Sequence, residues 1–172
     1  MKAKITPTSR ERNMRENDFI VSKTDLTGRI TYCNRIFVEF SGYTEDELLG
    51  AQHNIIRHPD MPRGVFKLLW DTIKAEKECF AYVKNMAKDG GFYWVFANIT
   101  PDYGTDGRPN GYYSVRRAPK RAAVDVAADL YRQMLKEEER AGARDACEVS
   151  VALLNKILAD KGVSYDEFIL TL

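Results

Sequence analysis

The stretch Ser41-Gly-Tyr-Thr-Glu-Asp-Glu-Leu-Leu-Gly50 lies between two strand-like segments and three later ones, and it contains the signals of two helix boundaries. Gly42 predicts the end of one helix, because glycine readily adopts the left-handed conformation that follows a helix C-terminus. Thr44 and Glu47 form a capping box that begins a second short helix, and Gly50 ends it. Two short helices are therefore expected to follow one another where the early strands end.

Before this stretch, the chain predicts an antiparallel hairpin followed by a helix. Residues 18–23 and 29–33 have the apolar and β-branched composition of strands, and Thr27-Gly28 between them predicts a tight turn. Asn34 comes directly after the second strand and is typical of an N-cap, so we expect it to begin a helix over residues 35–40.

After this stretch, one helix precedes three longer strands. Residues 51–62 are irregular and contain two prolines, whereas residues 65–75 carry a helical apolar stripe that includes Trp70. Strands are predicted over residues 79–86, 91–100 and 112–117, with a hairpin turn at Asp89-Gly90 and a longer loop over residues 102–111. This order predicts an α+β fold, in which short helices cover one face of a five-stranded antiparallel sheet.

The composition divides the chain into three sections. Residues 1–16 are rich in charges and form an N-terminal cap, residues 17–118 hold nearly all the aromatic residues and form the central domain, and residues 119–172 form a C-terminal helical extension. Apolar stripes in the extension predict two helices, and a capping box at Ser164 and Glu167 predicts a short third one. These stripes must bury against their own domain, a second copy or another protein.

The bulk properties exclude several classes of protein. The 172 residues carry a net charge of +1, so no overall field attracts nucleic acid. The three cysteines form no CxxC motif, which argues against a zinc knuckle or a disulfide framework and fits a reducing cytosol. The polar start does not read as a signal peptide, and no stretch approaches the roughly 20 apolar residues of a membrane span. We therefore expect a cytoplasmic protein without direct membrane insertion.

Residues in both halves of the central section resemble a PAS domain. In the first half these are Asn34, Phe37 and residues 41–50. In the second half they are Lys84-Asn85, the turn Lys88-Asp-Gly-Gly91, Tyr93-Trp-Val95 and Gly111-Tyr112. The resemblance covers residues 17–118 and implies the PAS fold. Because many PAS domains share these features, they imply little about function.

A second motif is more specific. The run His53-Asn-Ile-Ile-Arg-His-Pro-Asp-Met-Pro62, followed by Trp70 and Val83-Lys-Asn85, resembles the PAS domain of aerotaxis receptors. This resemblance implies that the chain binds FAD and reports the redox, oxygen or energy state of the cell. The chain departs from the receptor pattern in showing no membrane anchor or signalling coiled coil, and in having Cys79-Phe80 where the receptors have a Trp.

Eight residues are candidates for cofactor contacts. A flavin needs an apolar slot for its ring, an amide for the ring edge and, in FAD, cations for the phosphates. Asn85 is the candidate for the ring edge, because small apolar residues share its face of the strand, and Asn98 on the next strand is a weaker candidate. The resemblance points to Arg57 and His58 as contacts of the phosphate, ribose or ring, with Asp60 orienting them.

The remaining three candidates also have ordinary structural interpretations. His53 lines the mouth of the site or caps a helix at the surface, and Trp70 walls the ring or packs in the core. Asn34 lies near the pocket in the related receptors, although its position predicts a helix cap. The other five candidates have structural alternatives as well. Asn85 could bond to neighbouring backbone, and Asn98 could lie on the outer face of the sheet. Arg57, His58 and Asp60 could simply hold their loop, through an Arg57–Asp60 pair and a hydrogen bond of His58.

FMN offers the same ring as FAD and is also possible. Other cofactors fit the sequence less well. A blue-light sensor of the LOV type needs a cysteine over the ring, and residues 53–61 contain none. Haem needs an axial ligand. His53 or His58 would have to supply it from a loop rich in prolines, which is an unfavourable place.

We expect a sensor in signal transduction rather than an enzyme, because the sequence has no nucleophile–base pair, metal-ligand spacing or phosphate loop. The expected partners are a second copy of the chain, in a homodimer, and a separate output protein of the chemotaxis or two-component type. The N-terminal cap or the C-terminal helices are the expected readout. The alternatives are a PAS interaction and dimerisation module with no redox cofactor, or a sensor of another small molecule.

Overall fold

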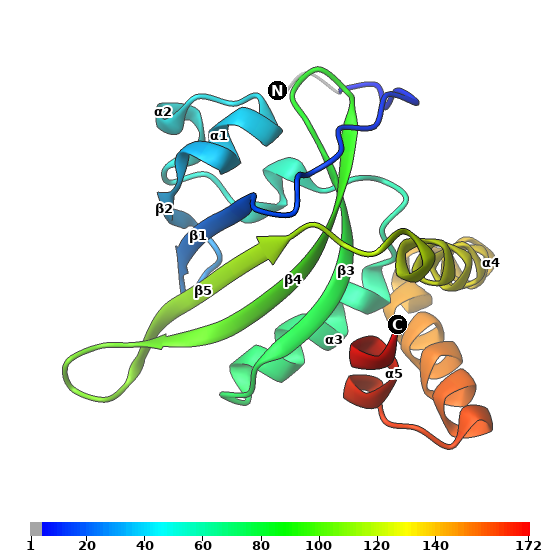
Figure 1. Cartoon of the computed structure of the whole chain (residues 1–172). Coiled ribbons are helices and arrows are strands. Elements are labelled where there is room, and N and C mark those ends of the chain that lie inside the picture. Colours follow the sequence, from blue (N-terminus) through cyan, green and yellow to red (C-terminus); the bar gives the residue numbers. More distant parts are fainter. Residues whose placement is uncertain (1–4) are drawn as a thin grey trace.

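Five antiparallel strands form one sheet in the computed structural model, which describes residues 5–172 (Figure 1). In space the strands run in the order β2-β1-β5-β4-β3, so the first hairpin lies beside the last strand. Their bounds are β1 Phe19–Asp25, β2 Ile30–Cys33, β3 Cys79–Met86, β4 Phe92–Tyr103 and β5 Pro109–Arg117. The predicted five-stranded antiparallel sheet is confirmed.

Short helices connect β2 to β3 and pack on one face of the sheet (Figure 1). They are α1 Arg35–Ser41, α2 Glu45–Leu48, the 3-10 turn η1 His53–Ile56 and α3 Arg63–Lys74. The turn η1 lies within residues 51–62, which the sequence predicts as irregular. The predicted α+β class is confirmed, and the apolar stripe of α3 faces the sheet.

The predicted caps form the corner between the sheet and these helices. Asn34 Oδ1 accepts hydrogen bonds from the backbone N–H of Phe37 at 3.1 Å and of Val21 at 3.0 Å. One side chain therefore begins α1 and fastens it to β1. Gly42 ends α1 with a φ of 70°, and Thr44 begins α2 through its capping box. These local signals act as the sequence predicts.

The loop between β4 and β5 is shorter than predicted. β4 continues to Tyr103 and β5 begins at Pro109, so the two strands form a long hairpin that extends beyond the sheet (Figure 1). The Gly104 N–H closes the turn by donating to the Arg108 carbonyl at 2.8 Å. The glycine and aspartate composition marks only this turn, because an irregularity at Asp102 lets the strands continue past it.

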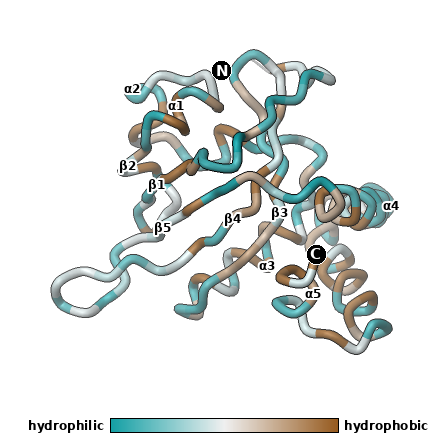
Figure 2. Tube along the Cα trace, in the orientation of Figure 1, coloured by the Kyte–Doolittle hydropathy of each residue, from teal (hydrophilic) through white to brown (hydrophobic). Residues whose placement is uncertain are grey.

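The C-terminal extension consists of α4 Arg121–Lys161 and α5 Tyr165–Thr171. Gly142 interrupts α4 with a φ of 75° and a ψ of 172°, so the two predicted helices form its two halves. Ser164 begins α5 through its capping box. Figure 2 shows hydrophobic residues along α5 and the second half of α4. No helix within residues 5–172 combines the length and the apolar character needed to cross a membrane.

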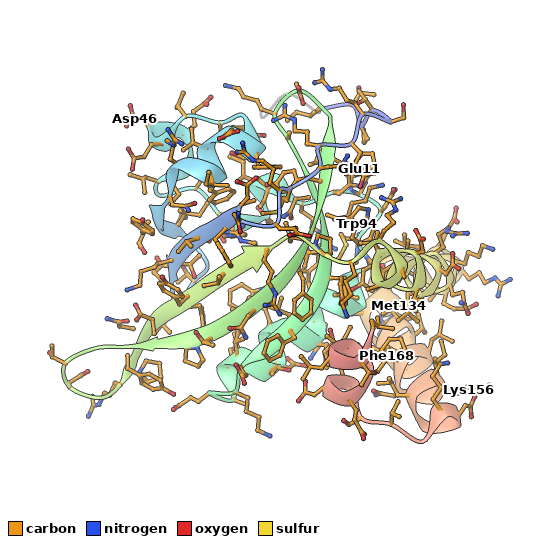
Figure 3. All side chains as sticks on the ribbon, viewed as in Figure 1. Glu11, Asp46, Trp94, Met134, Lys156 and Phe168 are labelled. Atoms are coloured by element: carbon orange, nitrogen blue, oxygen red, sulfur yellow. The ribbon has the colours of Figure 1, made fainter. Side chains whose placement is uncertain are left out.

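Two tyrosines of the extension cover the free edge of the sheet. Tyr131 donates a hydrogen bond from its hydroxyl to the Tyr82 carbonyl at 2.7 Å, and Tyr165 donates to the Phe80 carbonyl at 2.8 Å. Because β3 is an edge strand, these hydroxyls satisfy carbonyl groups that another strand could otherwise reach. Trp94 stacks on Tyr131 with ring centroids 6.3 Å apart, and Figure 3 shows Trp94 beside α4.

Residues 5–18 contain no helix and run beside the start of β4, where β5 has already ended. The Arg12 N–H donates to the Phe92 carbonyl at 2.8 Å, and the Phe92 N–H donates to the Arg10 carbonyl at 2.9 Å. Glu11 also forms an ion pair with Arg121 at the start of α4. Residues 1–4 of the predicted cap lie outside the described residues.

Candidate functional site

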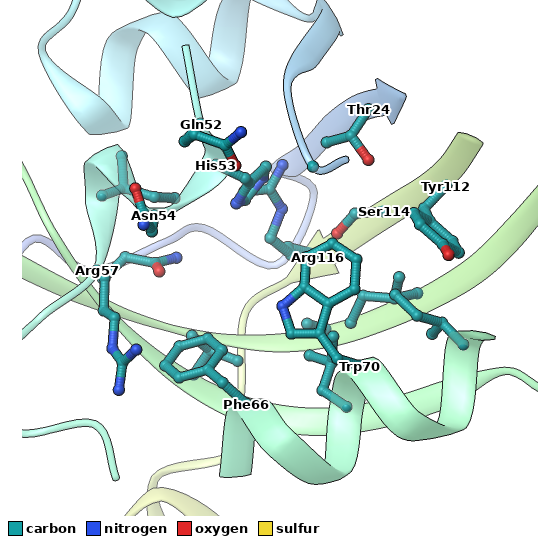
Figure 4. Close-up of a pocket in the computed structure, with 18 residues that line it drawn as sticks. Thr24, Gln52, His53, Asn54, Arg57, Phe66, Trp70, Tyr112, Ser114 and Arg116 are labelled. Carbon is teal, nitrogen blue, oxygen red and sulfur yellow. The ribbon is translucent and has the colours of Figure 1, made fainter. Parts of the chain in front are cut away.

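A cavity of about 220 Å³ lies between the inner face of the sheet, α3 and η1 (Figure 4). Its floor consists of inward residues of the strands, which alternate with residues of the outer face. On β4 and β5 these include Ala97, Ile99 and Ser114, whose modest size leaves room above the sheet. The opposite wall consists of Phe66, Leu69, Trp70 and Ile73 from the apolar stripe of α3.

Trp70 lies along the cavity as the sequence predicts, and its position depends on Gly28. The Trp70 ring meets Tyr112 edge-on, with ring centroids 5.6 Å apart. A Cβ atom on Gly28 would lie 3.0 Å from the Trp70 ring, and Gly28 has a φ of 83°. A glycine is therefore needed here both for the turn between β1 and β2 and for the close approach of the indole.

Asn85 points into the cavity from β3 and is only 4% exposed. Its Nδ2 has no hydrogen-bond partner among residues 5–172, so the alternative of a bond from the amide to neighbouring backbone does not hold for this nitrogen. Leaving a buried donor unpaired costs about 1–3 kcal/mol. An unpaired amide at a cavity wall therefore indicates a place where a ligand accepts a hydrogen bond.

Arg57 also lines the cavity, at the side of η1. Its guanidinium lies 4.3 Å from the centre of the Phe66 ring and donates to the Met61 carbonyl at 3.3 Å. Burial lowers its pKa, and the nearby carboxylate of Glu138 opposes that shift. The predicted Arg57–Asp60 pair does not form, because Asp60 pairs with Lys84 at 2.6 Å instead.

The structure places His58 away from the cavity. Its ring is buried against Phe92, with centroids 5.9 Å apart, and its Nδ1 accepts the backbone N–H of Asp60 at 3.1 Å. Burial, with the charge of Lys84, lowers the pKa of His58 to about 4, so the ring is neutral at neutral pH. The predicted hydrogen bond of His58 thus holds the loop, while the side chain points away from the predicted ligand.

Asp60, Asn34 and Asn98 also lie outside the cavity lining. Asp60 is exposed in its pair with Lys84, and Asn34 is fully used as the cap of α1. Asn98 lies on the outer face of β4, where its Nδ2 donates to Glu78 at 3.2 Å. For Asn34 and Asn98 the structural interpretations describe the observed positions, whereas Asp60 pairs with Lys84 in place of the expected Arg57.

His53 lies at the cavity, and its ring packs inward although the residue as a whole is partly exposed. The ring stacks on Phe37 with centroids 5.8 Å apart, and its Nε2 lies 3.2 Å from the Ser22 hydroxyl. Burial and then the charge of Arg116 lower the pKa of His53 to about 3. His53 is therefore a neutral hydrogen-bonding group at this site.

Arg116 is the main residue of the cavity that the sequence analysis missed. It is 2% exposed, lines the cavity from β5 and donates from Nη2 to the Ser22 hydroxyl. Burial lowers its pKa to about 10, so it stays charged. The signal that would have found it is the alternation along β5, which puts Tyr112, Ser114 and Arg116 on one face.

Gln52 and Asn54 complete the polar lining beside His53, and Thr24 lies at the end of β1 (Figure 4). Phe80, which stands near the Trp position of the receptor pattern, lies on the outer face and stacks on Phe96 with centroids 5.8 Å apart. The aromatic walls therefore come from α3 and β5 rather than from the start of β3.

Comparison with known proteins agrees with this architecture. A family model described as the PAS fold matches residues 30–116. The chain is 37% identical to the aerotaxis receptor of Escherichia coli (strain K12) over 127 residues, which are 74% of the chain and 25% of the receptor. It is 30% identical to the nitrogen fixation regulatory protein of Klebsiella pneumoniae over 97 residues, which are 56% of the chain and 20% of that protein.

The chain thus spans a quarter or less of the length of these two relatives. The predicted resemblance to the PAS domain of aerotaxis receptors is confirmed.

Solved structures of LOV domains share the fold at low sequence identity. The light-state LOV domain of the photoreceptor Aureochrome1 aligns with a TM-score of 0.55 at 20% identity, covering 66% of this chain and 90% of that chain. The LOV domain of a blue-light-activated histidine kinase from Erythrobacter litoralis aligns with a TM-score of 0.53 at 18% identity, covering 58% of this chain and 94% of that chain. At this level of identity the two comparisons show a shared fold and nothing more.

Proposed function

The chain belongs to the PAS-fold family, and on that premise we propose that it is a flavin-binding sensor of redox, oxygen or energy state. The observation that carries the proposal is the buried Asn85 amide, whose Nδ2 is unpartnered among the described residues. The edge of a flavin ring presents an N–H between two carbonyl oxygens, and an amide matches both kinds of group. When bound, the flavin supplies a reversible change of charge and a visible absorption band.

The cavity suits the ring system of a flavin better than the whole of FAD. Its volume of about 220 Å³ is below the range of roughly 300–1,000 Å³ that holds entire drug-sized ligands. The ring would lie between Trp70 and the sheet, with the remainder of the cofactor extending past Arg57. A guanidinium at that place suits a phosphate, which FAD and FMN both carry. We propose FAD because the resemblance to aerotaxis receptors points to that cofactor.

We assign His58 and Asp60 a role in positioning the loop rather than in touching the ring. His58 accepts the Asp60 N–H, and Asp60 pairs with Lys84 on β3. These contacts hold residues 57–61 against the edge strand and so keep Arg57 at the cavity. Asn34 acts through α1, whereas Asn98 is too far around the sheet to contribute.

The C-terminal extension is the proposed route of the signal. The carboxylate of Glu138 in α4 reaches the first turn of α3, and it also lies near Arg57. The Arg63 side chain donates to the Ala143 carbonyl at 3.3 Å, next to the break in α4. A change of charge in the cavity would alter the wall formed by α3, and α4 is fastened directly to that wall.

The outer face of the sheet favours contact with other proteins. Tyr32 and Tyr113 flank Lys23 across β2, β1 and β5, and they are 47% and 37% exposed. Exposed tyrosines are enriched at interfaces. We propose that this face forms a homodimer, and that the sensor acts in the cytoplasm on a separate output protein of the chemotaxis or two-component type. A dimer without a cofactor is the second candidate function.

The deciding experiment is the visible absorption spectrum of the purified protein before and after dithionite, repeated after incubation with FAD and, separately, with FMN. We expect flavin bands that dithionite bleaches. A Soret band would assign haem instead. A well-folded protein that takes up neither flavin would overturn the proposal and leave the interaction module or another small-molecule ligand.

Hydrogen exchange tests the signalling part of the proposal in the flavin-loaded protein. We expect oxidised and reduced samples to differ in α4, α5 or residues 5–16. Identical exchange maps in all three segments would overturn that route while leaving flavin binding intact.

A further inference from the structure

Arg116 is a buried cation with no acidic partner among residues 5–172. Its Nε and Nη1 have no hydrogen-bond partner there, and the hydroxyl of Tyr93 nearby is also unpartnered. Within residues 5–172, Arg116 donates a hydrogen bond to Ser22, and its guanidinium lies 4.5 Å from the centre of the Phe37 ring. These contacts offset only part of the cost of burying a charge.

The titratable groups that pack around Arg116 are neutral at neutral pH. Burial raises the pKa of Tyr93 and of Cys33 above their ordinary values. The pKa of His53 is lowered to about 3 by burial and then by Arg116 itself. The strands and helices around Arg116 therefore supply dipoles but no negative charge.

The cavity next to Arg116 also has positive charge without negative charge in its described lining. Its described lining includes two guanidinium groups, those of Arg57 and Arg116, and no carboxylate. Figure 4 shows the Arg116 side chain extending from β5 toward His53. Positions that break the rule that buried charges are paired are expected to be functional or strained sites.

We propose that Arg116 is the specificity-determining residue of this cavity, and that it selects the form of the ligand that carries a negative charge beside its guanidinium. The proposal rests on the proposed flavin site and deepens it. If dithionite, a one-electron donor, reduced the bound flavin, one electron would add to the neutral ring with no bond broken and no proton taken up. Arg116, which keeps its proton, would then supply the counter-charge to the ring.

The test is the one-electron midpoint potential of the flavin-loaded protein between about pH 6 and 9, a range in which the groups around Arg116 keep their charge state. For the unmodified protein we expect a potential that does not change with pH, because no proton accompanies the electron. In Arg116→Gln the reduced ring loses its counter-charge and takes up a proton. The potential should then fall by about 59 mV for each unit by which the pH rises, since a tenfold change in an equilibrium constant equals 59 mV for one electron.

Arg117→Gln is the matched control. Arg117 follows Arg116 on the same strand but lies on the outer face, with its guanidinium 5.1 Å from the centre of the Phe96 ring. The net charge changes equally in the two variants, so a remote charge effect would shift both. We expect Arg117→Gln to keep the pH-independent potential, whereas equal behaviour of the two variants would overturn the assignment.

Two further variants separate a ligand role from a structural one. Arg116→Lys keeps the positive charge, and it should keep a pH-independent potential even where Arg116→Gln fails to fold. A pH-dependent potential in the lysine variant would overturn the proposal. Arg116→Met removes the uncompensated charge, so the ligand-free variant should unfold at the same temperature as the unmodified protein or higher. A lower unfolding temperature would indicate that Arg116 serves the core.

The two proposals fail in different ways. If the unmodified protein binds no flavin, the proposed function fails. If it binds flavin and Arg116→Gln has the same potential and the same pH dependence, only the role of Arg116 fails.

Discussion

Glu138 accepts a hydrogen bond from the backbone N–H of Gly64 at 3.0 Å, so a side chain of α4 caps the first turn of α3. The residue before that helix, Pro62, makes no side-chain cap of its own. Glu138 is 8% exposed, and a carboxylate at a helix N-terminus is favoured by the helix dipole. The contact joins the C-terminal extension to the helix that walls the cavity.

Replacing Glu138 with alanine should therefore lower the free energy of unfolding by about 1–2 kcal/mol, since it removes the cap of a buried helix terminus. Urea unfolding measures the loss, and hydrogen exchange should rise in the first turn of α3. The neighbouring Glu139 is exposed, and Glu139→Ala is the control. Equal stability of the two variants would contradict a capping role for Glu138.

The packing of α4 on α3 also depends on the absence of a side chain at Gly64. A Cβ atom there would lie 2.5 Å from the Ser150 hydroxyl and 3.1 Å from the backbone nitrogen of Val151. Gly64→Ala should destabilise the protein by roughly 1–3 kcal/mol through overpacking. Thermal or urea unfolding measures this loss.

The double variant Gly64→Ala with Ser150→Gly provides the control for that prediction. Removing the Ser150 side chain opens space for the new methyl group, so the double variant should be more stable than the sum of the two single effects predicts. Strict additivity would show that the close contact between the two helices is not the cause.

The Tyr131 hydroxyl protects a carbonyl at the sheet edge. Tyr131→Phe should cost about 1 kcal/mol, because the Tyr82 carbonyl loses its partner while the ring keeps its packing. The variant should also aggregate more readily on storage, since β3 then presents an unpaired group. Unfolding and light scattering measure the two effects. Unchanged values in both would show that the hydrogen bond contributes nothing.

Much of the fold could be predicted because its signals act over a few residues. The cap at Asn34 and the capping box at Thr44 need only their own neighbours in the chain. The predicted length of the β4–β5 hairpin was wrong, because pairing between residues distant in the sequence decides where a strand ends. The site was partly predicted: Asn85 and Trp70 lie on periodic elements, and their direction follows from the period.

The parts of the site that were missed depend on tertiary contacts. Arg116 and Arg117 look like an exposed basic pair at the end of a strand, and only the covering helices make one of them buried. His58 turns toward Phe92 because the loop after η1 packs on the edge strand. No spacing within that loop reveals such a direction.

Because the amide of Asn85 is unpaired among the described residues, its replacement should affect stability and flavin binding in opposite directions. Asn85→Leu replaces a buried donor that lacks a partner with an apolar group of similar size, so the ligand-free protein should be as stable as the unmodified one or more stable. Flavin affinity should fall at least about tenfold, which equals 1.4 kcal/mol. Flavin titration and thermal unfolding measure the pair. Asn98→Leu, on the outer face, should leave flavin affinity unchanged.

His58 makes stability depend on pH. Its pKa is about 4 in the folded protein and about 6.5 when the chain unfolds, so the unfolded chain binds more protons between these values. Stability is therefore full above about pH 6.5 and falls as the pH decreases, by up to about 1.4 kcal/mol per pH unit for this residue. His53, whose folded pKa is about 3, acts in the same direction.

Urea unfolding at several pH values between about 5 and 6.5 isolates this effect, because most carboxylates stay ionised there. His58→Gln cannot titrate in either state, so its free energy of unfolding should fall about half as steeply with decreasing pH as that of the unmodified protein, which has two histidines. An unchanged slope would show that the His58 ring takes up a proton in the folded protein. It would then pair with Asp60, which lies 3.6 Å from its Nδ1.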